Sequence, residues 1–428
     1  MHVDVGAACG DERAGACNAK GVCMGPRMSL GAMRENTCAR VHDGSVWCWG
    51  ANVNGQIGDG TTVERPNPTR VRGLPPASSV TVGYYHACAI AMDGDVYCWG
   101  RNQFGQLGNG EQGVEAVSVP QKVDGVHAPR ALALGEDHTC ALLENGDVVC
   151  WGSNAFAQIG AATGTAIPRP TRVDIAPADK IATAKRHTCA VLHDESTVVC
   201  WGWNLQRQLG PAAGASATSA AAVPVDLPRG VKATDVTVAH RSTCALGADQ
   251  YVYCWGLNDV GQLGNGTQAG SVMVDRGDGT IQPAEPNPGV VLRRDEDGGG
   301  PLANVQQLFS TDGSHVIVRT NDRIAPFYSW GKDDRGELGR GELGTPGQVF
   351  PLAMVVKVLP LDARAIASGE DHVCAVFASP ADPSSPGASP TIQCYGSSWG
   401  DGAGVVGSED PATAQPLPAE VKWLESPP

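Results

Sequence analysis

The sequence predicts an all-β fold, a seven-bladed β-propeller of four-stranded blades, from three observations. The dipeptide Trp-Gly recurs along the chain, and a pair of Cys residues accompanies most copies. Gly (55) and Pro (30) make about a fifth of the 428 residues, which is typical of many short strands joined by tight turns. The first five copies lie about 50 residues apart and the later intervals are longer. The copies are Trp49-Gly50, Trp99-Gly100, Trp151-Gly152, Trp201-Gly202, Trp255-Gly256, Trp330-Gly331 and the variant Tyr395-Gly396.

Each copy belongs to a longer pattern that predicts four strands. Residues 138–152 read HTCALLENGDVVCWG, two alternating segments around a Gly-containing turn, which predicts a β-hairpin. Asn-x-x-Gly-Gln-Leu-Gly follows, as at residues 102–108, and a variable loop then leads to a Pro and a short apolar segment. Each unit therefore supplies a small antiparallel sheet.

Seven such sheets predict a closed ring. One sheet cannot bury both of its faces, whereas seven arranged radially bury each other's faces and leave short edges. An elongated solenoid is the alternative, but a count of seven without an obvious capping repeat favours closure. The tail at residues 418–424 resembles the strand after each Gly-Gln-Leu-Gly segment and is expected to help close the ring. We assign residues 28–428 to the propeller and residues 1–27 to a Cys-rich leader or stalk.

Twelve of the 15 Cys residues form six pairs, each flanking one hairpin. A three-residue loop, Glu144 to Gly146, places Cys140 opposite Cys150 at a non-hydrogen-bonded site, where the Cα atoms lie about 4.5 Å apart, within disulfide reach. The sixth unit has Ile317 and Ser329 instead, so both partners are lost together, as expected for a disulfide. Zinc ligation is the competing interpretation, but it lacks a fixed third and fourth ligand. The predicted disulfides are Cys38–Cys48, Cys88–Cys98, Cys140–Cys150, Cys189–Cys200, Cys244–Cys254 and Cys374–Cys394.

The repeat as a whole resembles the regulator of chromosome condensation family. The pattern Gly-x-x-His-Thr-x-Ala-Leu, then Asp-Gly-x-Val-x-x-Trp-Gly-x-Asn-x-x-Gly-Gln-Leu-Gly, carries the resemblance from about residue 28 to the end. It implies the seven-bladed fold but no single function, because the family includes exchange factors, photoreceptors and inhibitors. Resemblance to Cys-stapled members implies a bacterial source and binding of proteins through loops around one face.

Disulfides and charge restrict where the protein acts and what it binds. Disulfides persist in oxidising compartments, which predicts a secreted, periplasmic or outer-cell-surface protein. No signal peptide is evident in the sequence, and no stretch of about 18 apolar residues predicts membrane insertion. A net charge of −14 without a basic run argues against nucleic acid as a partner. We expect a monomer, and the pairing of Cys9, Cys17 and Cys23 stays open.

The two residues before each repeat His position vary while the frame stays constant. In a closed propeller these turns surround one mouth of the axial channel, and Tyr and Arg are favoured anchors in interfaces. We predict a protein- or peptide-binding face here; solvated turn residues without a role are the alternative. The candidate residues are Arg34, Glu35, Tyr84, Tyr85, Glu136, Asp137, Lys185, Arg186, His240, Arg241, Glu370 and Asp371, with Gly313 and Ser314 at the sixth position.

Metal or catalytic chemistry is the rival prediction. Two Glu-Asp-His segments, 136–138 and 370–372, combine carboxylate and imidazole, which can act in acid–base catalysis or bind metal. Five His residues share one repeat position, however, and a structural role explains them better. An acidic insertion at 275–297 offers oxygen ligands to calcium, although its spacing fits no strict motif.

No catalytic motif supports an enzyme: Gly-x-Ser-x-Gly, His-Glu-x-x-His and a phosphate-binding Gly-Lys-Ser/Thr loop are all missing. The leading hypothesis is a secreted or cell-surface propeller that presents one loop-decorated face to a protein or peptide. The alternative is an enzyme or a metal-dependent binder with its site at the mouth of the axial channel.

Overall fold

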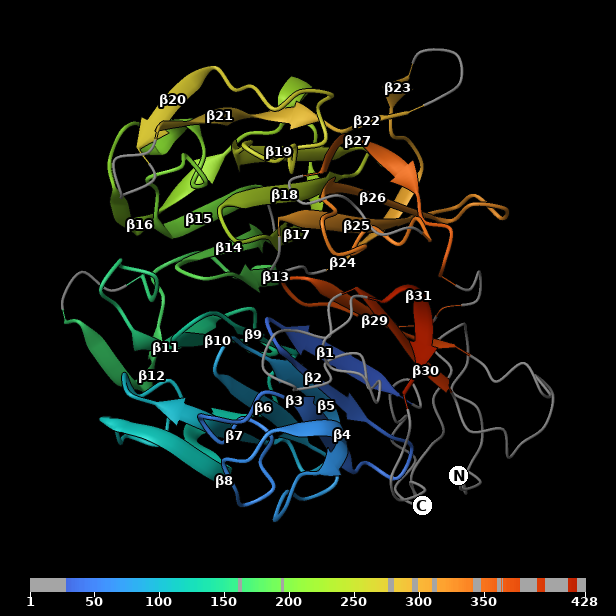
Figure 1. The fold of residues 1–428 in the computed structure, drawn as a ribbon. Coiled ribbons are helices and arrows are strands. Elements are labelled where there is room, and N and C mark those ends of the chain that lie inside the picture. Colours follow the sequence, from blue (N-terminus) through green and yellow to red (C-terminus); the bar gives the residue numbers. More distant parts are fainter. Residues whose placement is uncertain are drawn as a thin grey trace, which may run out of the picture.

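The structure is a computed structural model. It describes residues 28–160, 164–193, 196–275, 281–294, 299–309, 314–341, 348–359, 363, 365–377, 391–396 and 415–421. Within these ranges the regular structure is β-strand apart from two 3-10 turns, Pro211–Ala213 and Pro228–Gly230. Seven sheets, each with an antiparallel four-stranded blade, follow one another around a ring (Figure 1), which confirms the predicted propeller. No helix of the described residues is long and apolar enough to cross a membrane.

The first four blades have four strands each, in sequence order. Blade 1 contains β1 (Ser29–Met33), β2 (Asn36–Arg40), β3 (Val46–Gly50) and β4 (Arg65–Arg70). Blade 2 contains β5 (Ala77–Val82), β6 (His86–Ala91), β7 (Asp95–Asn102) and β8 (Val114–His127). Blade 3 contains β9 (Ala131–Leu134), β10 (His138–Leu142), β11 (Val148–Ser153) and β12 (Ala166–Arg172). Blade 4 contains β13 (Ala178–Thr183), β14 (His187–Leu192), β15 (Val198–Trp203) and β16 (Thr218–Val225).

The last three blades include the insertions. Blade 5 contains β17 (Ala233–Val238), β18 (Ser242–Gly247), β19 (Val252–Leu257) and β21 (Ile281–Val290), and β20 (Val272–Asp275) extends it. Blade 6 contains β24 (Val305–Phe309), β25 (His315–Thr320), β26 (Phe327–Lys332) and β27 (Val349–Val355), and β22 (Leu292–Arg293) and β23 (Gly300–Pro301) extend it. Blade 7 contains β28 (Ala365–Ser368), β29 (His372–Phe377), β30 (Thr391–Gly396) and β31 (Gln415–Glu420).

The first strand of each blade lines the axis and closes the ring. These strands contact each other in the cycle β1, β5, β9, β13, β17, β24, β28 and back to β1. They enclose an axial cavity of about 280 Å³. The tail forms β31, the outer strand of blade 7, and Val421 packs with Trp47 and Trp49 between blades 7 and 1. The tail thus completes the last blade as the sequence predicts.

The six predicted disulfides are all present, each across a central hairpin. Every pair faces its partner directly in the strand register with a Cα–Cα distance of 4.1 Å. The predicted three-residue loop is confirmed in blade 3, where Leu143 N donates to Asp147 O and Gly146 has φ 84°. In blade 6, Ile317 lies opposite Ser329 in the same register, so the frame persists there without a disulfide.

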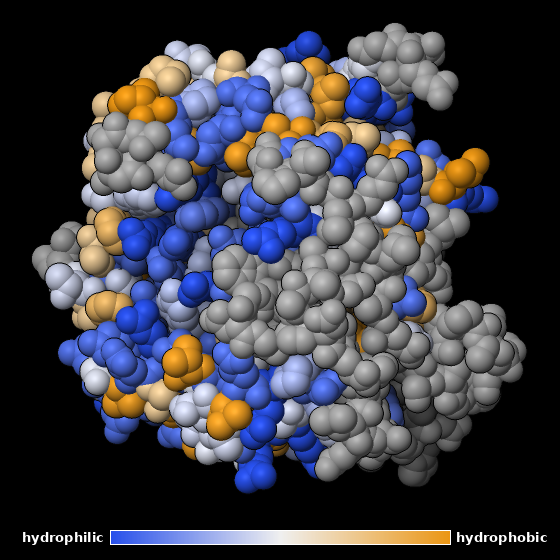
Figure 2. Space-filling view, in the orientation of Figure 1, coloured by the Kyte–Doolittle hydropathy of each residue, from blue (hydrophilic) through white to orange (hydrophobic). Residues whose placement is uncertain are grey.

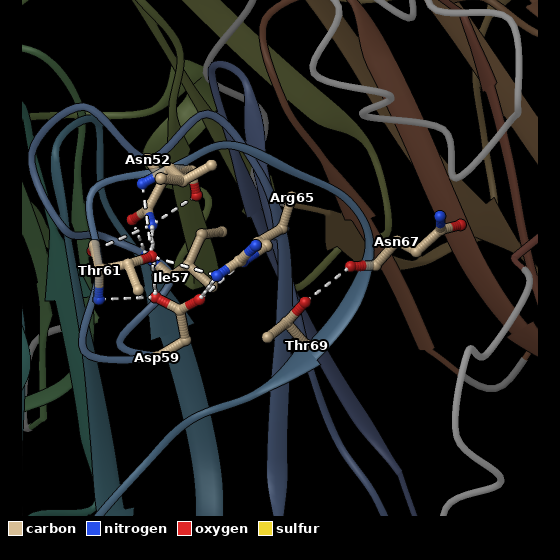
Figure 3. A network of polar contacts seen from close by, with 8 residues as sticks. Asn52, Ile57, Asp59, Thr61, Arg65, Asn67 and Thr69 are labelled. Atoms are coloured by element: carbon tan, nitrogen blue, oxygen red, sulfur yellow. Dashed lines mark hydrogen bonds and ion pairs between the residues drawn. The ribbon is translucent and has the colours of Figure 1, made fainter.

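The Asn of the repeat pattern organises the turn after each Trp-Gly. In blade 1, Asn52 Oδ1 accepts a hydrogen bond from Ile57 N (3.0 Å) while its Nδ2 donates to Val63 O (2.8 Å) (Figure 3). The same Oδ1 acceptor recurs at the equivalent Asn of blades 2 to 5. Blade 6 has Asp333 here, and Arg340 Nε donates to its second oxygen (2.6 Å), so the added charge is paired.

Trp side chains couple each blade to the one before it. Every Trp of the six Trp-Gly dipeptides is fully buried. In five of them the indole Nε1 donates a hydrogen bond to a backbone oxygen of the preceding blade. The acceptor is the Gln of the Gly-Gln-Leu-Gly segment or its variant. An indole buries a large apolar area and still needs a partner for its N–H, which this carbonyl supplies. The Trp-Gly and Gln positions of the repeat are therefore two halves of one contact between blades.

Candidate functional site: the mouth of the axial channel

The turns between the first and second strands form one end of the channel. We call their residues the mouth turns: 34–35, 84–85, 136–137, 185–186, 240–241, 314 and 370–371. Neighbouring turns are joined directly, since Tyr84 N donates to Gly135 O (3.2 Å) and Glu136 N donates to Lys185 O (3.3 Å). Gly313 lies outside the described residues. The structure thus brings the predicted positions into one ring.

Each mouth turn is held by the Gly of the Trp-Gly dipeptide. In blade 2, Tyr85 O accepts a hydrogen bond from Arg101 N (2.8 Å), directly after Gly100. Gly100 has φ 109°, and a Cβ there would lie 2.5 Å from Tyr85 O. The close approach therefore requires glycine. It also places the side chain that follows Trp-Gly beside the mouth.

Tyr85 is held between two guanidinium groups. Arg34 Nη1 donates to the Tyr85 hydroxyl (2.6 Å), and Arg34 and Arg101 each lie 5.1 Å from the centroid of the ring. Arg101 also pairs with Asp137 (3.3 Å), which accepts a further hydrogen bond from Gln106 (3.0 Å). Burial raises the pKa of the Tyr85 hydroxyl. The cluster is a fixed cation–π arrangement at the rim.

A second cationic cluster lies at blades 3 to 5. Arg186 pairs with Glu136 (3.1 Å) and lies over the rings of Phe156 and Trp203, at 4.5 and 5.6 Å. Arg241 lies over the same Trp203 ring at 5.8 Å. Arginine heads stacked on aromatic rings are pre-organised for contact with a partner because fewer rotamers are lost on binding.

The opposite side of the mouth is acidic. Lys332 Nζ lies 2.9 Å from Asp371 Oδ1 and 3.0 Å from Asp334 Oδ1, and Glu337 lies beside them. Burial raises the pKa of Glu337 to about 8, and burial together with Asp371 raises the pKa of Glu370. The mouth therefore has a cationic side at blades 1 to 5 and an acidic side at blades 6 and 7.

The sequence-predicted residues differ in accessibility. Tyr84 is 3% exposed and packs in the core between blades 1 and 2, with Lys185 Nζ 5.5 Å from its ring centroid. Arg34 and Glu35 form an ion pair within one turn (3.8 Å). The other eleven are half-buried, namely Arg34, Glu35, Tyr85, Glu136, Asp137, Lys185, Arg186, His240, Arg241, Glu370 and Asp371.

The structure adds residues to the site that the sequence did not place there. Arg101, Trp203 and Lys332 all follow a Trp-Gly dipeptide directly, and the carbonyl contact described above brings that position to the mouth. This variable position of the repeat is the signal that could have revealed them. Phe156 and Glu337 come from the Asn-x-x-Gly-Gln-Leu-Gly turn, or its variant, which follows that position directly in the chain.

The repeat histidines are structural. His86, His138, His187, His315 and His372 are buried, and each Nε2 lies 2.7–3.1 Å from a Thr or Ser hydroxyl of the next blade. Burial lowers the pKa of His138 to about 3, so the imidazole is neutral. The two Glu-Asp-His segments therefore bring their carboxylates, and not their imidazoles, to the mouth.

The other sequence-predicted features fall mostly outside the described residues. The leader at 1–27 lies outside them, as do residues 276–280 and 295–298 of the acidic insertion, which include Asp278, Asp295, Glu296 and Asp297. Asp275 ends β20. Calcium binding by the 275–297 insertion stays a prediction.

Replacement of Asp137 by Asn is expected to stabilise the protein at neutral pH. Burial raises the pKa of the Asp137 carboxyl from 3.8 to about 6, against the lowering influence of Arg101. The folded state thus favours the protonated carboxyl. The contribution of this group to the free energy of unfolding is complete below about pH 4 and is lost as the pH rises through about 6. The loss amounts to about 3 kcal/mol. Urea unfolding of the parent and the variant at about pH 4 and at neutral pH measures this loss. A variant less stable than the parent at neutral pH would show that the ion pair with Arg101 outweighs burial.

Comparisons with known proteins agree with this fold. A family model described as RCC1-like domain matches residues 24–275. The chain is 27% identical to the ultraviolet-B receptor UVR8 of Arabidopsis thaliana, over 82% of this chain and 73% of that protein. It is also 27% identical to the mitochondrial RCC1 domain-containing protein RUG3 of the same plant, over 51% of this chain and 45% of RUG3, so it spans less than half of RUG3.

Solved structures show the same architecture. Prp20p of Saccharomyces cerevisiae matches with a TM-score of 0.65 at 21% identity, over 80% of each chain. Human WBSCR16 matches with a TM-score of 0.66 at 20% identity, over 86% of this chain and 92% of that chain. The Prp20p structure is described together with binding to Gsp1p and histones, and a further structure has yeast Prp20 bound by Kap60.

Proposed function

Because this chain belongs to the RCC1-like domain family, we propose that it is a protein-binding propeller that presents its mouth turns to a protein or peptide partner. Propellers with this fold bind proteins, as Prp20p does with Gsp1p. The observation that carries the proposal is Tyr85, half-buried between Arg34 and Arg101 at the rim. Tyr and Arg held in this way act as anchors because their geometry is fixed before binding.

Charge further defines the surface that would fit. Arg34, Arg101 and Arg186 lie on the cationic side, and Asp334 and Asp371 on the acidic side. We infer a partner with carboxylates facing the first side and cations facing the second. On the view in Figure 2 hydrophilic residues predominate over the described blades and hydrophobic ones are scattered, so no large apolar patch is visible on the described surface of this view.

We also propose that the protein acts in an oxidising compartment, secreted, periplasmic or on the outer cell surface. Six buried disulfides support this location, because reducing compartments keep such thiols free. A bacterial source and a monomeric state stay predictions from the sequence.

Affinity capture followed by measurement of the dissociation constant tests the binding proposal. The intact protein serves as bait in the medium and envelope of the producing organism, and the captured partner is purified for titration. We expect Tyr85→Ala/Arg186→Ala to weaken binding about 100-fold or more, as for two anchor residues. Tyr84 is left intact because it belongs to the core.

Two arginines far from the mouth supply the matched control. Arg169 and Arg172 lie on β12, the outer strand of blade 3, with side chains 65% and 53% exposed. Arg169→Ala/Arg172→Ala should bind the partner like the parent. The proposal fails if no partner is held specifically, or if the mouth variant and the outer variant bind alike.

A metal-dependent role at the mouth is the second candidate. It is favoured by the carboxylates gathered on the acidic side, Asp334, Glu337 and Asp371. Catalysis has no comparable observation in its favour among the described residues.

A further inference from the structure

The acidic side of the mouth contains three carboxylates that converge on one point. Asp334 and Glu337 come from the turn after β26, and Asp371 comes from the mouth turn of blade 7. One oxygen from each lies within 4.8 Å of the other two. Acidic groups at this distance repel each other unless a cation lies between them or a proton is shared.

An equivalent cluster in blades 2 and 3 shows what is unusual here. Arg101, Gln106 and Asp137 occupy the same repeat positions as Lys332, Glu337 and Asp371. There the Gln106 amide donates to Asp137 (3.0 Å), so the pair is a satisfied hydrogen bond. In blades 6 and 7 the carboxylate of Glu337 replaces that amide, so this side chain has no N–H to donate to Asp371.

Glu337 forms no direct ion pair among the described residues, although the nearby Lys332 ammonium acts to lower the pKa of its carboxyl. Blade 6 carries a second such change, Asp333 in place of Asn, and Arg340 compensates for it with a hydrogen bond of 2.6 Å. Glu337 is fully buried, and one of its oxygens accepts from Arg335 N (2.7 Å). Its other oxygen, Oε1, has no hydrogen-bond partner in the part of the chain that the structure describes. A buried carboxylate oxygen without a partner is costly, and a bound cation would offset that cost.

Charge and ligand chemistry identify the class of ion. When all three carboxyls are ionised, as coordination of a metal ion requires, they and the single ammonium of Lys332, which contacts Asp334 and Asp371, carry a net charge of −2. All three donors are oxygens, which suits hard divalent cations. Opposite oxygens around Ca²⁺ lie about 5 Å apart, and Ca²⁺ tolerates irregular geometry, whereas Mg²⁺ takes one or two carboxylates in a strict octahedron.

We propose that Asp334, Glu337 and Asp371 form a calcium site at the mouth, with the remaining coordination positions open to water or to an oxygen of a bound partner. The site does not depend on the proposed protein binding. It is separate from the acidic insertion at 275–297, since its ligands come from blades 6 and 7.

Titration of the full chain with CaCl2 tests this site. After removal of divalent ions on a chelating resin, isothermal titration calorimetry should detect Ca²⁺ binding that Glu337→Gln weakens at least about tenfold, because a uniquely buried ligand is lost. Glu337→Gln should fold, since Gln occupies the equivalent position of blades 1 to 5. The melting temperature should rise with CaCl2 in the parent and not in the variant.

Asp137→Asn supplies the matched control. It removes the carboxylate at the repeat position of Asp371, but in the cluster of blades 2 and 3, and it should leave the calcium response unchanged. The proposal is overturned if the parent protein shows neither a heat of binding nor a higher melting temperature at millimolar CaCl2. Equal binding by the parent and Glu337→Gln also overturns it, because the calcium would then lie elsewhere. Tighter binding of MgCl2 than of CaCl2 overturns the assignment to calcium. None of these three results bears on the capture of a protein partner.

Discussion

Reduction of all six disulfides is expected to unfold the propeller under conditions in which the oxidised protein is folded. Five of the bonds link residues 10 or 11 apart and the sixth links residues 20 apart. Each closed loop of this size stabilises the folded state by about 3 kcal/mol in the chain-entropy model. Six such contributions exceed the roughly 5–15 kcal/mol that separates folded from unfolded domains.

The measurement is recovery of structure with and without reductant. The twelve cysteines of the six disulfides are at most 2% exposed, so reduction is carried out in urea, where the sulfurs become accessible. On dilution into buffer with reductant we expect no return of the β-sheet circular dichroism signal, while oxidised protein should recover it. Return of the full signal with free thiols verified by mass spectrometry would show that blade packing alone is sufficient.

Single blades provide graded controls. Cys140→Ala/Cys150→Ala should lower the free energy of unfolding by about 3 kcal/mol. Conversely, Ile317→Cys/Ser329→Cys should form a seventh disulfide, because these residues face each other in the register of the six natural pairs. Its net gain should be smaller, since buried Ile317 loses its packing. A pair that stays reduced in air would show that blade 6 departs from the common hairpin geometry.

The fold and the disulfides were predictable because the repeat encodes them seven times. Trp-Gly, the hairpin turn and the Cys spacing each carry a local signal, and the sixth blade supplied a control in Ile317 and Ser329. The ring of turns at the mouth was also predictable, since identical blades place identical turns at one end.

Contacts between blades were harder to predict, because each joins residues about 50 positions apart. The bonds between repeat histidines and the next blade's Thr are an example. Where blade 1 has Asn36 instead of His, blade 2 has Ala87 instead of Thr; where blade 5 has Ser242, blade 6 has Val316. Both partners change together in these two cases, whereas blade 7 has Val373 at the Thr position and His315 bonds Ser368 instead. Aligning each blade with its neighbour would therefore have revealed most of the pairing.

The same reasoning explains why Glu337 went unnoticed. Within one repeat it is a conservative change from Gln. Its consequence appears only when Asp371 of the next blade and Lys332 are placed beside it. Departures from the pattern that neighbouring blades do not compensate are therefore the places in a repeat ring where we expect a site.

Gly100→Ala should be among the most destabilising single substitutions, because two separate costs add. The residue has φ 109°, outside the regions that Ala occupies readily, and a Cβ there would lie 2.5 Å from Tyr85 O and 2.7 Å from the Cα of His86. Backbone strain and overpacking each cost roughly 1–3 kcal/mol, so we expect a loss of about 4 kcal/mol in urea unfolding.

Gly113→Ala separates the two costs. Gly113 lies in the same blade and has φ 84°, but a Cβ there meets nothing within 4 Å. It should therefore lose only the strain contribution, about 1 kcal/mol. Equal losses in the two variants would contradict the steric explanation.

The Gly100 variant also connects the blade frame with the mouth. The hydrogen bond from Arg101 N to Tyr85 O cannot form at 2.8 Å if a Cβ displaces the turn, so Tyr85 should leave its position between Arg34 and Arg101. Partner binding should then weaken even at temperatures where the variant is folded, whereas Gly113→Ala should bind normally. Unchanged binding by folded Gly100→Ala would mean that recognition does not depend on the Tyr85 cluster, and the binding face would have to be sought in other loops.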